Sequence, residues 1–307
     1  MRSALLVVLL SAVLGAQSAY VPERVFHSGQ KSFTDFEVML ADVAKADVVL
    51  VGEQHDDPNT HQLELALLQG LARRRTGRVI VSLEMFERDV QEPLDHFQMG
   101  HMDEGEFLRS SRPWPNYAKD YKPLVEFART KEWPVIAANV PRSFASDVSK
   151  SGLDALKAKA GDEVHWFAKD LKCPFGDDYF DRFAEAMGQH PGKDDKSKTA
   201  SAKEADRQRL ERYYQAQCLK DETMGESIAR AFEIASVGGQ KPLVVHFNGA
   251  FHTDFTLGTA ERARRRLPGK RVVVLSVLPV ESLDTLAPDK AERKRADYLV
   301  YTTKTKK

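Results

Sequence analysis

Short, nearly continuous apolar runs recur along the chain, separated in its first half by segments of helical periodicity. The runs cover residues 47–52, 79–84, 134–138, 243–247 and 272–278, with a weaker one at 298–301. Runs of this length and composition are typical of strands buried on both faces of a parallel sheet. We therefore predict a strand at each of these places.

Helical stripes follow the first strands, and a long strand-free region follows the third. The two stripes consist of Leu63, Leu67, Leu68 and Leu71, then Leu124, Val125 and Ala128. Strand–helix alternation predicts an α/β fold with three α/β/α layers and a mostly parallel central sheet. Residues 141–237 have no strand pattern and predict helices at 147–159, 178–187 and 204–235. They form a helical insertion, in which the charged, Gly- and Pro-containing stretch 188–198 is expected to be an exposed loop.

The N-terminus has the pattern of a cleavable signal peptide. Arg2 precedes an apolar run and a small-residue region that ends at Ala19. The run is shorter than the roughly 20 residues that a membrane-spanning helix needs. We expect residues 1–19 to be removed, leaving 20–307 as a single domain without stable membrane insertion. No cysteine lies near the cleavage region for a lipid anchor, which favours a periplasmic or secreted protein.

Charge and cysteine content narrow the classes of function. The chain has 45 basic and 45 acidic residues, which gives no electrostatic reason to expect a nucleic-acid partner. Cys173 and Cys218 are its two cysteines. In an exported protein such a pair predicts a disulfide, worth roughly 4 kcal/mol for a loop of this size. Two unrelated buried thiols are the alternative.

Two strand ends carry the same motif. The strand at 47–52 ends in Gly52-Glu53-Gln54-His55, and the strand at 243–247 is followed by Gly249-Ala250-Phe251-His252. Glycine permits a sharp turn, and the histidine then lies above the carboxyl edge, where open α/β sheets bind ligands. The strand at 79–84 ends in Glu84, whose carboxylate is costly to bury unless it is paired or bound to a cation.

His55, Glu84 and His252 are therefore candidate ligands of a divalent metal with an open coordination position. Glu53 is a further ligand or a general base for metal-bound water, and Asn248 is a donor to developing negative charge. Each of these residues also has a purely structural interpretation. A single histidine after a strand is more often a turn residue, and Glu84 on its own can pair with Arg88.

Other polar residues rank behind this set. Asn139 and Arg142 follow the strand at 134–138 and suit anionic groups at the same rim. His61 is either a neighbour of His55 or a solvated helix start, and His246 is expected to be a core residue with satisfied hydrogen bonds. The aromatic stretch 114–121 is expected to pack under a loop. Its phenols, Tyr117 and Tyr121, are also possible ligands of ferric haem.

These segments together resemble the ChaN family of haem-binding uptake proteins in the Tiki superfamily. The matching pieces are Gly52–Asp57, His61, 82–86, 114–121, 137–142 and 247–252. The resemblance implies a three-layer α/β/α fold and haem binding linked to iron acquisition, with a homodimer as one arrangement. It also implies that His55, Glu84 and His252 form the metal or catalytic set, as in Tiki metalloproteases, and that Gly52 and Gly249 belong to the ligand site.

The sequence leaves three functions open. The leading hypothesis is an exported protein that binds haem or another small ligand and serves iron or haem uptake. The second is a metal-dependent hydrolase, in which His55, Glu84 and His252 hold the metal while Glu53 and Asn248 do the catalytic work. The third is an exported scaffold with a vestigial cluster. Strand-end histidines and carboxylates serve the first two equally, so the sequence does not decide between them.

Overall fold

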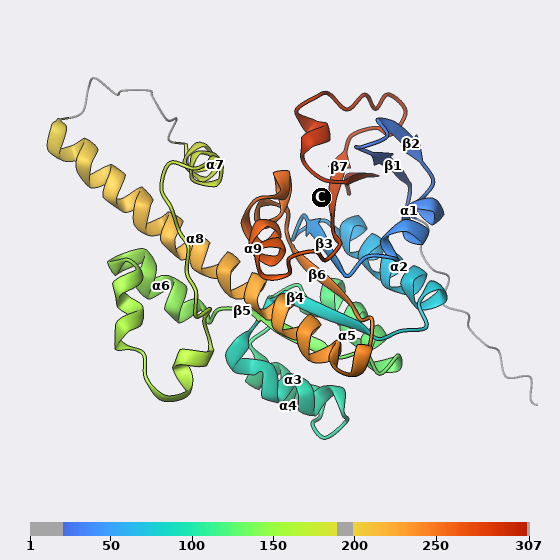
Figure 1. Ribbon diagram of the computed structural model, residues 1–307, viewed down its shortest axis with the longest axis horizontal. Coiled ribbons are helices and arrows are strands. Elements are labelled where there is room, and N and C mark those ends of the chain that lie inside the picture. Colours follow the sequence, from blue (N-terminus) through green and yellow to red (C-terminus); the bar gives the residue numbers. More distant parts are fainter. Residues whose placement is uncertain (1–20, 189–198, 306–307) are drawn as a thin grey trace, which may run out of the picture.

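A single eight-stranded sheet organises the protein, as the computed structural model shows (Figure 1). The model describes residues 21–188 and 199–305, so the predicted signal peptide and residues 189–198 of the predicted loop lie outside the described residues. The strands are β1 (Glu23–His27), β2 (Ser32–Thr34), β3 (Val48–Glu53), β4 (Val79–Glu87), β5 (Val135–Asn139), β6 (Leu243–Gly249), β7 (Val272–Val280) and β8 (Tyr298–Thr303). Their order is β2-β1-β8-β7-β3-β6-β4-β5.

Strand pairing is parallel from β8 to β5 and antiparallel where β1 joins β2 and β8. β3 lies between β7 and β6, and β6 lies between β3 and β4. The carboxyl ends of β3, β6 and β4 are therefore neighbours at one edge of the sheet. This order brings together the three strand ends that the sequence singled out.

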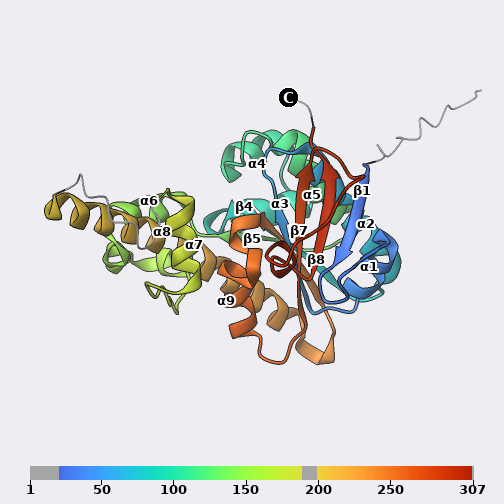
Figure 2. The same ribbon diagram turned by 90° about the horizontal axis from the view of Figure 1, so that it is seen from above.

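Helices cover both faces of the sheet, which gives three layers (Figure 2). One face packs against α1 (Phe36–Val43), α2 (Pro58–Arg74), α3 (Gln91–Gln98), α4 (Glu104–Ser111) and α5 (Lys122–Thr130). The other packs against α9 (Gly258–Arg266) and the C-terminal half of α8 (Ala200–Ala235). The predicted leucine stripe from Leu63 to Leu71 is buried in the first of these two cores. The predicted three-layer fold is confirmed.

A helical arm projects from the sheet and ends in the N-terminal half of α8 (Figure 1). It contains α6 (Arg142–Ser151), α7 (Asp178–Ala186) and a disulfide between Cys173 and Cys218, as predicted. Helix α8 is one continuous helix, close to the helix predicted at 204–235. Ile228 and Phe232, in its second half, already pack on the sheet.

The prediction of one helix at 147–159 is wrong. Gly152 adopts φ +78°, a left-handed conformation that ends α6, and residues Leu153–Ala158 continue as a separate 3-10 helix. The first two strands and helices α1, α3 and α4 were missed. β1 and β2 are short strands at the end of the sheet with partly exposed residues, so neither shows a continuous apolar run.

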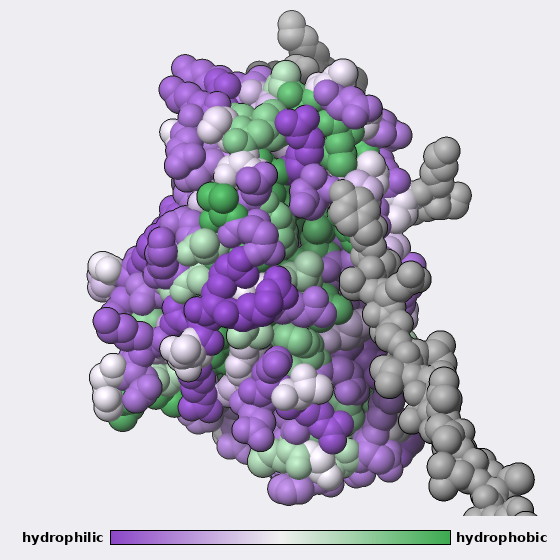
Figure 3. Space-filling view, turned by 90° about the vertical axis from the view of Figure 1, so that its right-hand side faces the viewer, coloured by the Kyte–Doolittle hydropathy of each residue, from purple (hydrophilic) through white to green (hydrophobic). Residues whose placement is uncertain are grey.

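One side of the molecule can be followed in a space-filling view. The side formed by the N-terminal strands and helices is mainly hydrophilic, with smaller apolar patches between (Figure 3). Among the helices within residues 21–188 and 199–305, none has the length and apolar character that crossing a membrane requires.

Candidate functional site at the carboxyl edge of the sheet

Glu84, His252 and His55 converge on the backbone of Gly249. The amide of Gly249 donates to Glu84 Oε2 at 2.8 Å, and His252 Nε2 lies 3.3 Å from Glu84 Oε1. A Cβ atom placed on Gly249 would lie 2.7 Å from His55 Nε2 and 3.7 Å from Glu84 Oε2. The two imidazoles and the carboxylate therefore lie on the same side of the sheet edge, near the Gly249 backbone. Among the described residues, the group whose ligand atoms all lie within 4.8 Å of one another is a different one, Glu53, His61 and Glu64.

Strand β4 is irregular where it carries Glu84. The predicted strand ended at Glu84, but β4 continues to Glu87, and its register with β5 shifts between Leu83 and Glu87. Such a bulge re-aims a side chain relative to the regular alternation of a strand. Positive charge on His252 and His55, and the Gly249 amide, hold the pKa of buried Glu84 well below its usual range despite burial, which alone would raise it.

Both motif glycines are required by close contacts. Besides the contact of Gly249 with His55, a Cβ on Gly52 would lie 2.9 Å from Thr253 Oγ1 and 3.0 Å from Ala250 Cα. The loops after β3 and β6 thus pack directly on each other. The glycine that begins each Gly-x-x-His motif allows this packing, because it has no side chain.

His55 is held by a carboxylate and a tyrosine. Its Nδ1 lies 2.6 Å from Glu53 Oε1, and the Tyr121 hydroxyl donates to the same oxygen. Trp114 packs edge-on against the imidazole at 4.6 Å. Burial alone would lower the pKa of His55, but the hydrogen bond and charge of Glu53, with the charge of Glu84, raise it. When Nδ1 carries the ring proton, Nε2 remains free on the side of the ring that faces Glu84.

Glu53 continues into a second buried layer formed by α2. Glu64 shares a hydrogen bond with Glu53, and His61 Nδ1 lies 2.9 Å from Glu64 Oε2. Burial and the neighbouring Glu53 raise the pKa of Glu64 far above its usual value. Ligand atoms of all three residues lie within 4.8 Å of one another, a spacing that would also suit a cation.

His61 belongs to this layer and not to a solvated helix start. It is buried, and its Nε2 donates to the carbonyl oxygen of His55 at 3.1 Å. The charges and hydrogen bonds of Glu64 and Glu53 outweigh burial and raise the pKa of His61 to about 9. His61 therefore fixes the backbone of the first motif.

His252 has a carboxylate partner from α8. Its Nδ1 lies 2.7 Å from Asp221 Oδ1, and the amide of Gln217 is 3.3 Å from the same nitrogen. Burial alone would lower the pKa of His252, but Glu84 and Asp221 raise it to about 10. His252 is therefore an imidazolium between two carboxylates when no cation is bound.

Several predicted site residues have other partners. The amide of Asn248 donates to the Gly249 carbonyl, Asn139 accepts from the Val140 amide, and Arg142 donates to Glu87. The hydroxyl of Tyr117 is buried and has no hydrogen-bond partner among the described residues. His246 bonds to Ser82 through Nδ1, while its Nε2 has no partner within the described chain.

No motif in the sequence indicated Asp221, Tyr179 or Gln217 as site residues. All three come from the helical region that lacked any motif, and Asp221 is 31 residues from His252 along the chain. An aspartate in the middle of a long helix is unremarkable by itself. Its contact with His252 depends on how α8 crosses the edge of the sheet.

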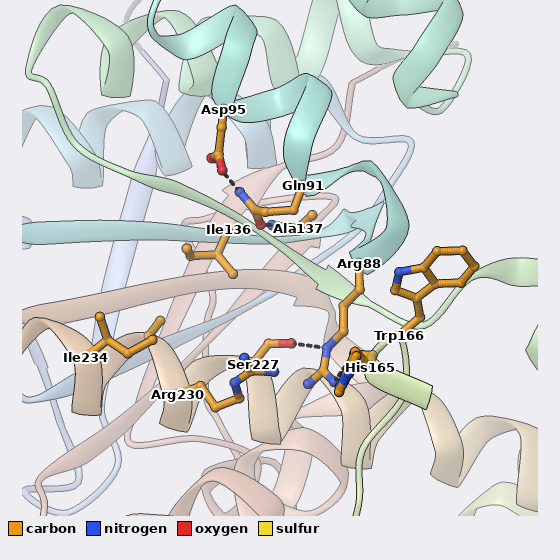
Figure 4. A pocket seen from close by; sticks show the side chains of 11 residues that line it. Arg88, Gln91, Asp95, Ile136, Ala137, His165, Trp166, Ser227, Arg230 and Ile234 are labelled. Atoms are coloured by element: carbon orange, nitrogen blue, oxygen red, sulfur yellow. Dashed lines mark hydrogen bonds between the residues drawn. The ribbon is translucent and has the colours of Figure 1, made fainter. Parts of the chain in front are cut away.

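A separate cavity of about 390 Å³ lies between β5, α3 and α8 (Figure 4). Arg88 lines this cavity, and its guanidinium group donates to Ser227, Glu226 and the Thr223 carbonyl. Gln91 caps the outer edge of β5 through Val135 and Ala137. Arg88 therefore joins the β4 end to α8, and the alternative pairing of Glu84 with Arg88 does not form.

Comparison with known proteins now identifies the family. The family model for haem-binding uptake proteins of the ChaN type, in the Tiki superfamily, matches residues 39–263. The chain belongs to this family. No curated protein sequence matches it significantly.

Solved structures are similar to this chain to different degrees. ChaN of Campylobacter jejuni, solved with cofacial haem, has a TM-score of 0.60 and 17% identity, covering 92% of this chain and 97% of its own. A Bacillus cereus protein has a TM-score of 0.45 and 12% identity over 87% and 91% of the two chains. An erythromycin esterase has a TM-score of 0.44 and 12% identity over 92% and 83%. The first of these supports the fold.

Proposed function

We propose that this protein is an exported haem-binding protein that serves haem or iron uptake. The observation that carries the proposal is the match of residues 39–263 to a haem-binding family. Export rests on the signal-like pattern of residues 1–19. N-terminal sequencing of protein recovered outside the cytoplasm tests it, with a start near residue 20 as the expected result and an intact Met1 as the contrary one.

Ferric haem needs an iron ligand that a flat porphyrin can reach. Tyr117 and Tyr121 are 2% and 1% exposed, and the Tyr121 hydroxyl is engaged by Glu53. Tyr213 on α8 is 39% exposed, the one exposed tyrosine within residues 21–188 and 199–305. A phenolate is an established ligand of haem iron. Accessibility therefore favours Tyr213 over the two tyrosines that the sequence suggested.

The position of Tyr213 relates it to the motif site. It lies four residues before Gln217, so the two side chains project from the same face of α8. Gln217 contacts His252. Arg209 and Lys220 lie four residues before and seven after Tyr213, on the same face. Their positive charges suit the two carboxylates of haem.

The second candidate function is a metal-dependent hydrolase. It is favoured by the convergence of His55, Glu84 and His252, because two imidazoles and one carboxylate are a ligand set for a divalent cation. Such a cation would polarise a carbonyl group or activate water. Glu53 would orient His55 through Nδ1 rather than act as the base, since its Oε1 already accepts two hydrogen bonds.

Haemin titration followed at the Soret band tests the haem proposal. We expect wild-type protein to shift the band, Tyr213→Phe to weaken haemin binding at least about tenfold, and His55→Ala to retain most of it. Tyr117→Phe is the matched control, because it removes a hydroxyl without a described partner. No Soret shift, together with stoichiometric divalent metal by elemental analysis, would favour the hydrolase. Light scattering with and without haemin tests the expected homodimer.

A further inference from the structure

The two motif histidines have the same pattern of partners. His55 Nδ1 meets Glu53, and Tyr121 donates to that carboxylate. His252 Nδ1 meets Asp221 Oδ1 at 2.7 Å, and the Tyr179 hydroxyl donates to Asp221 Oδ2 at 2.6 Å. The first set comes from β3 and the segment before α5. The second comes from α7 and α8.

We infer that Asp221 and Tyr179 are positioning residues that hold the His252 imidazole with its Nε2 toward Glu84. Asp221 and Tyr179 therefore do for His252 what Glu53 and Tyr121 do for His55. Helices α7 and α8 thus supply the carboxylate and the tyrosine that hold one of the two motif histidines. This inference goes beyond the proposed function, because it concerns the free protein and does not depend on haem.

Burial makes this arrangement costly to disturb. Asp221 is fully buried, and its two oxygens accept from His252, Tyr179 and Thr259 Oγ1, the last at 2.8 Å. A Cβ on Gly258 would lie 3.0 Å from Asp221 Oδ1, so the carboxylate has no free space on that side. Carboxylates that accept from the second nitrogen of a ligand histidine fix its orientation and raise its basicity. Asp221 therefore directs His252 Nε2 toward Glu84.

The disulfide joins the two segments that carry these residues. Cys218 precedes Asp221 by one helical turn, and Cys173 lies in the segment that leads into α7 and Tyr179. The bridge closes a loop over a sequence separation of 45 residues. It thereby restrains both positioning residues relative to the sheet, and an oxidising compartment would preserve this restraint.

Nitrogen-15 NMR of histidine-labelled, metal-free protein tests the inference directly. A buried imidazole N–H that donates to a carboxylate gives a downfield, slowly exchanging proton, which His252→Gln assigns by its loss. We expect Asp221→Asn to move this proton upfield and Tyr179→Phe to move it less. Tyr214→Phe is the control, because that buried neighbour donates to Asp177. A His252 proton unchanged in Asp221→Asn would overturn the inference.

Cobalt binding adds a readout that separates this inference from the proposals on function. If the site holds a divalent cation, Asp221→Asn should weaken Co²⁺ binding about 10- to 100-fold, while Tyr214→Phe leaves it unchanged. A wild-type protein that binds no Co²⁺ would count against the hydrolase. The NMR comparison would still decide whether Asp221 positions His252.

Discussion

His55 and His252 have similar polar partners but very different exposure. The side chain of His55 is 45% exposed, whereas that of His252 is 7% exposed. Each imidazole directs Nδ1 to a buried carboxylate that also accepts from a tyrosine. The two histidines differ in the segments that cover them. His55 lies at an open loop under Trp114, and His252 lies under α8.

This contrast separates two tasks within one site. A half-exposed imidazole can meet an incoming ligand, while a buried imidazolium between two carboxylates holds the architecture until a cation displaces its proton. If this is right, changes around His252 should cost folding stability, and changes around His55 should mainly affect binding. The following predictions test that division, beginning with the largest effect.

Asp221→Ala should lower the free energy of unfolding by about 3–5 kcal/mol. It leaves the His252 imidazolium and the Tyr179 and Thr259 hydroxyls buried without their acceptor, and breaking a buried charge pair has a cost of this size. Urea denaturation measures it. The comparison would fail if His55→Ala, at the open loop, destabilised the protein equally.

Removing the disulfide should destabilise the protein by up to about 4 kcal/mol, the chain-entropy value for a loop of this length. A variant with both Cys173→Ser and Cys218→Ser should also disturb the NMR signal of His252 and spare that of His55, because the bridge restrains only the segments around Asp221. Denaturation and histidine spectra of oxidised and substituted protein measure both effects. Equal disturbance of the two histidines would contradict the division.

Stability of the metal-free protein should fall by about 2 kcal/mol between pH 7 and 9. Folding raises the pKa of His252 to about 10, from an ordinary value near 6.5. Its contribution is therefore complete below about pH 6.5 and is lost as the pH rises through about 10. His61, with a pKa of about 9, acts in the same direction. His252→Gln should reduce the slope of the profile measured by thermal denaturation to the part that His61 contributes, and an unchanged profile would refute the assignment.

Tyr121→Phe and Tyr179→Phe should each cost about 1 kcal/mol, the usual net worth of one buried hydrogen bond. Because they act on different carboxylates, the double variant should lose about the sum. Tyr117→Phe should change stability by less than about 0.5 kcal/mol, since its hydroxyl is unpaired among the described residues. Chemical denaturation of the four proteins measures these differences. A costly Tyr117→Phe would show that its hydroxyl has a partner.

The sequence predicted the parts of the site that follow strands. Apolar runs located β3, β4 and β6, and the repeated glycine–histidine spacing located His55 and His252, because parallel strands place their carboxyl ends together. It did not predict Asp221 or Tyr179. These depend on the long-range packing of α8 and α7, for which a single sequence has no local signal. The bulge at Glu84 was also missed, because a bulge leaves the apolar pattern of the strand intact.

The exposure of the tyrosine side chains could likewise not be predicted from the sequence. Tyr117 and Tyr121 were expected to pack under a loop, with haem ligation as the alternative, and both are buried. Tyr213 has no motif around it, and it is exposed on α8, whose N-terminal half projects from the sheet (Figure 1). Exposure is a property of packing, so it could not be read from residue type or spacing.

Anomalous diffraction at the iron edge from crystals of the haemin complex tests the central claim most directly, because it locates the iron without reference to any variant. We predict an iron peak within bonding distance of the Tyr213 hydroxyl, on the face of α8 that also carries Gln217. An iron peak at Tyr117 or Tyr121, or haem bound away from this face of α8, would contradict the proposed site.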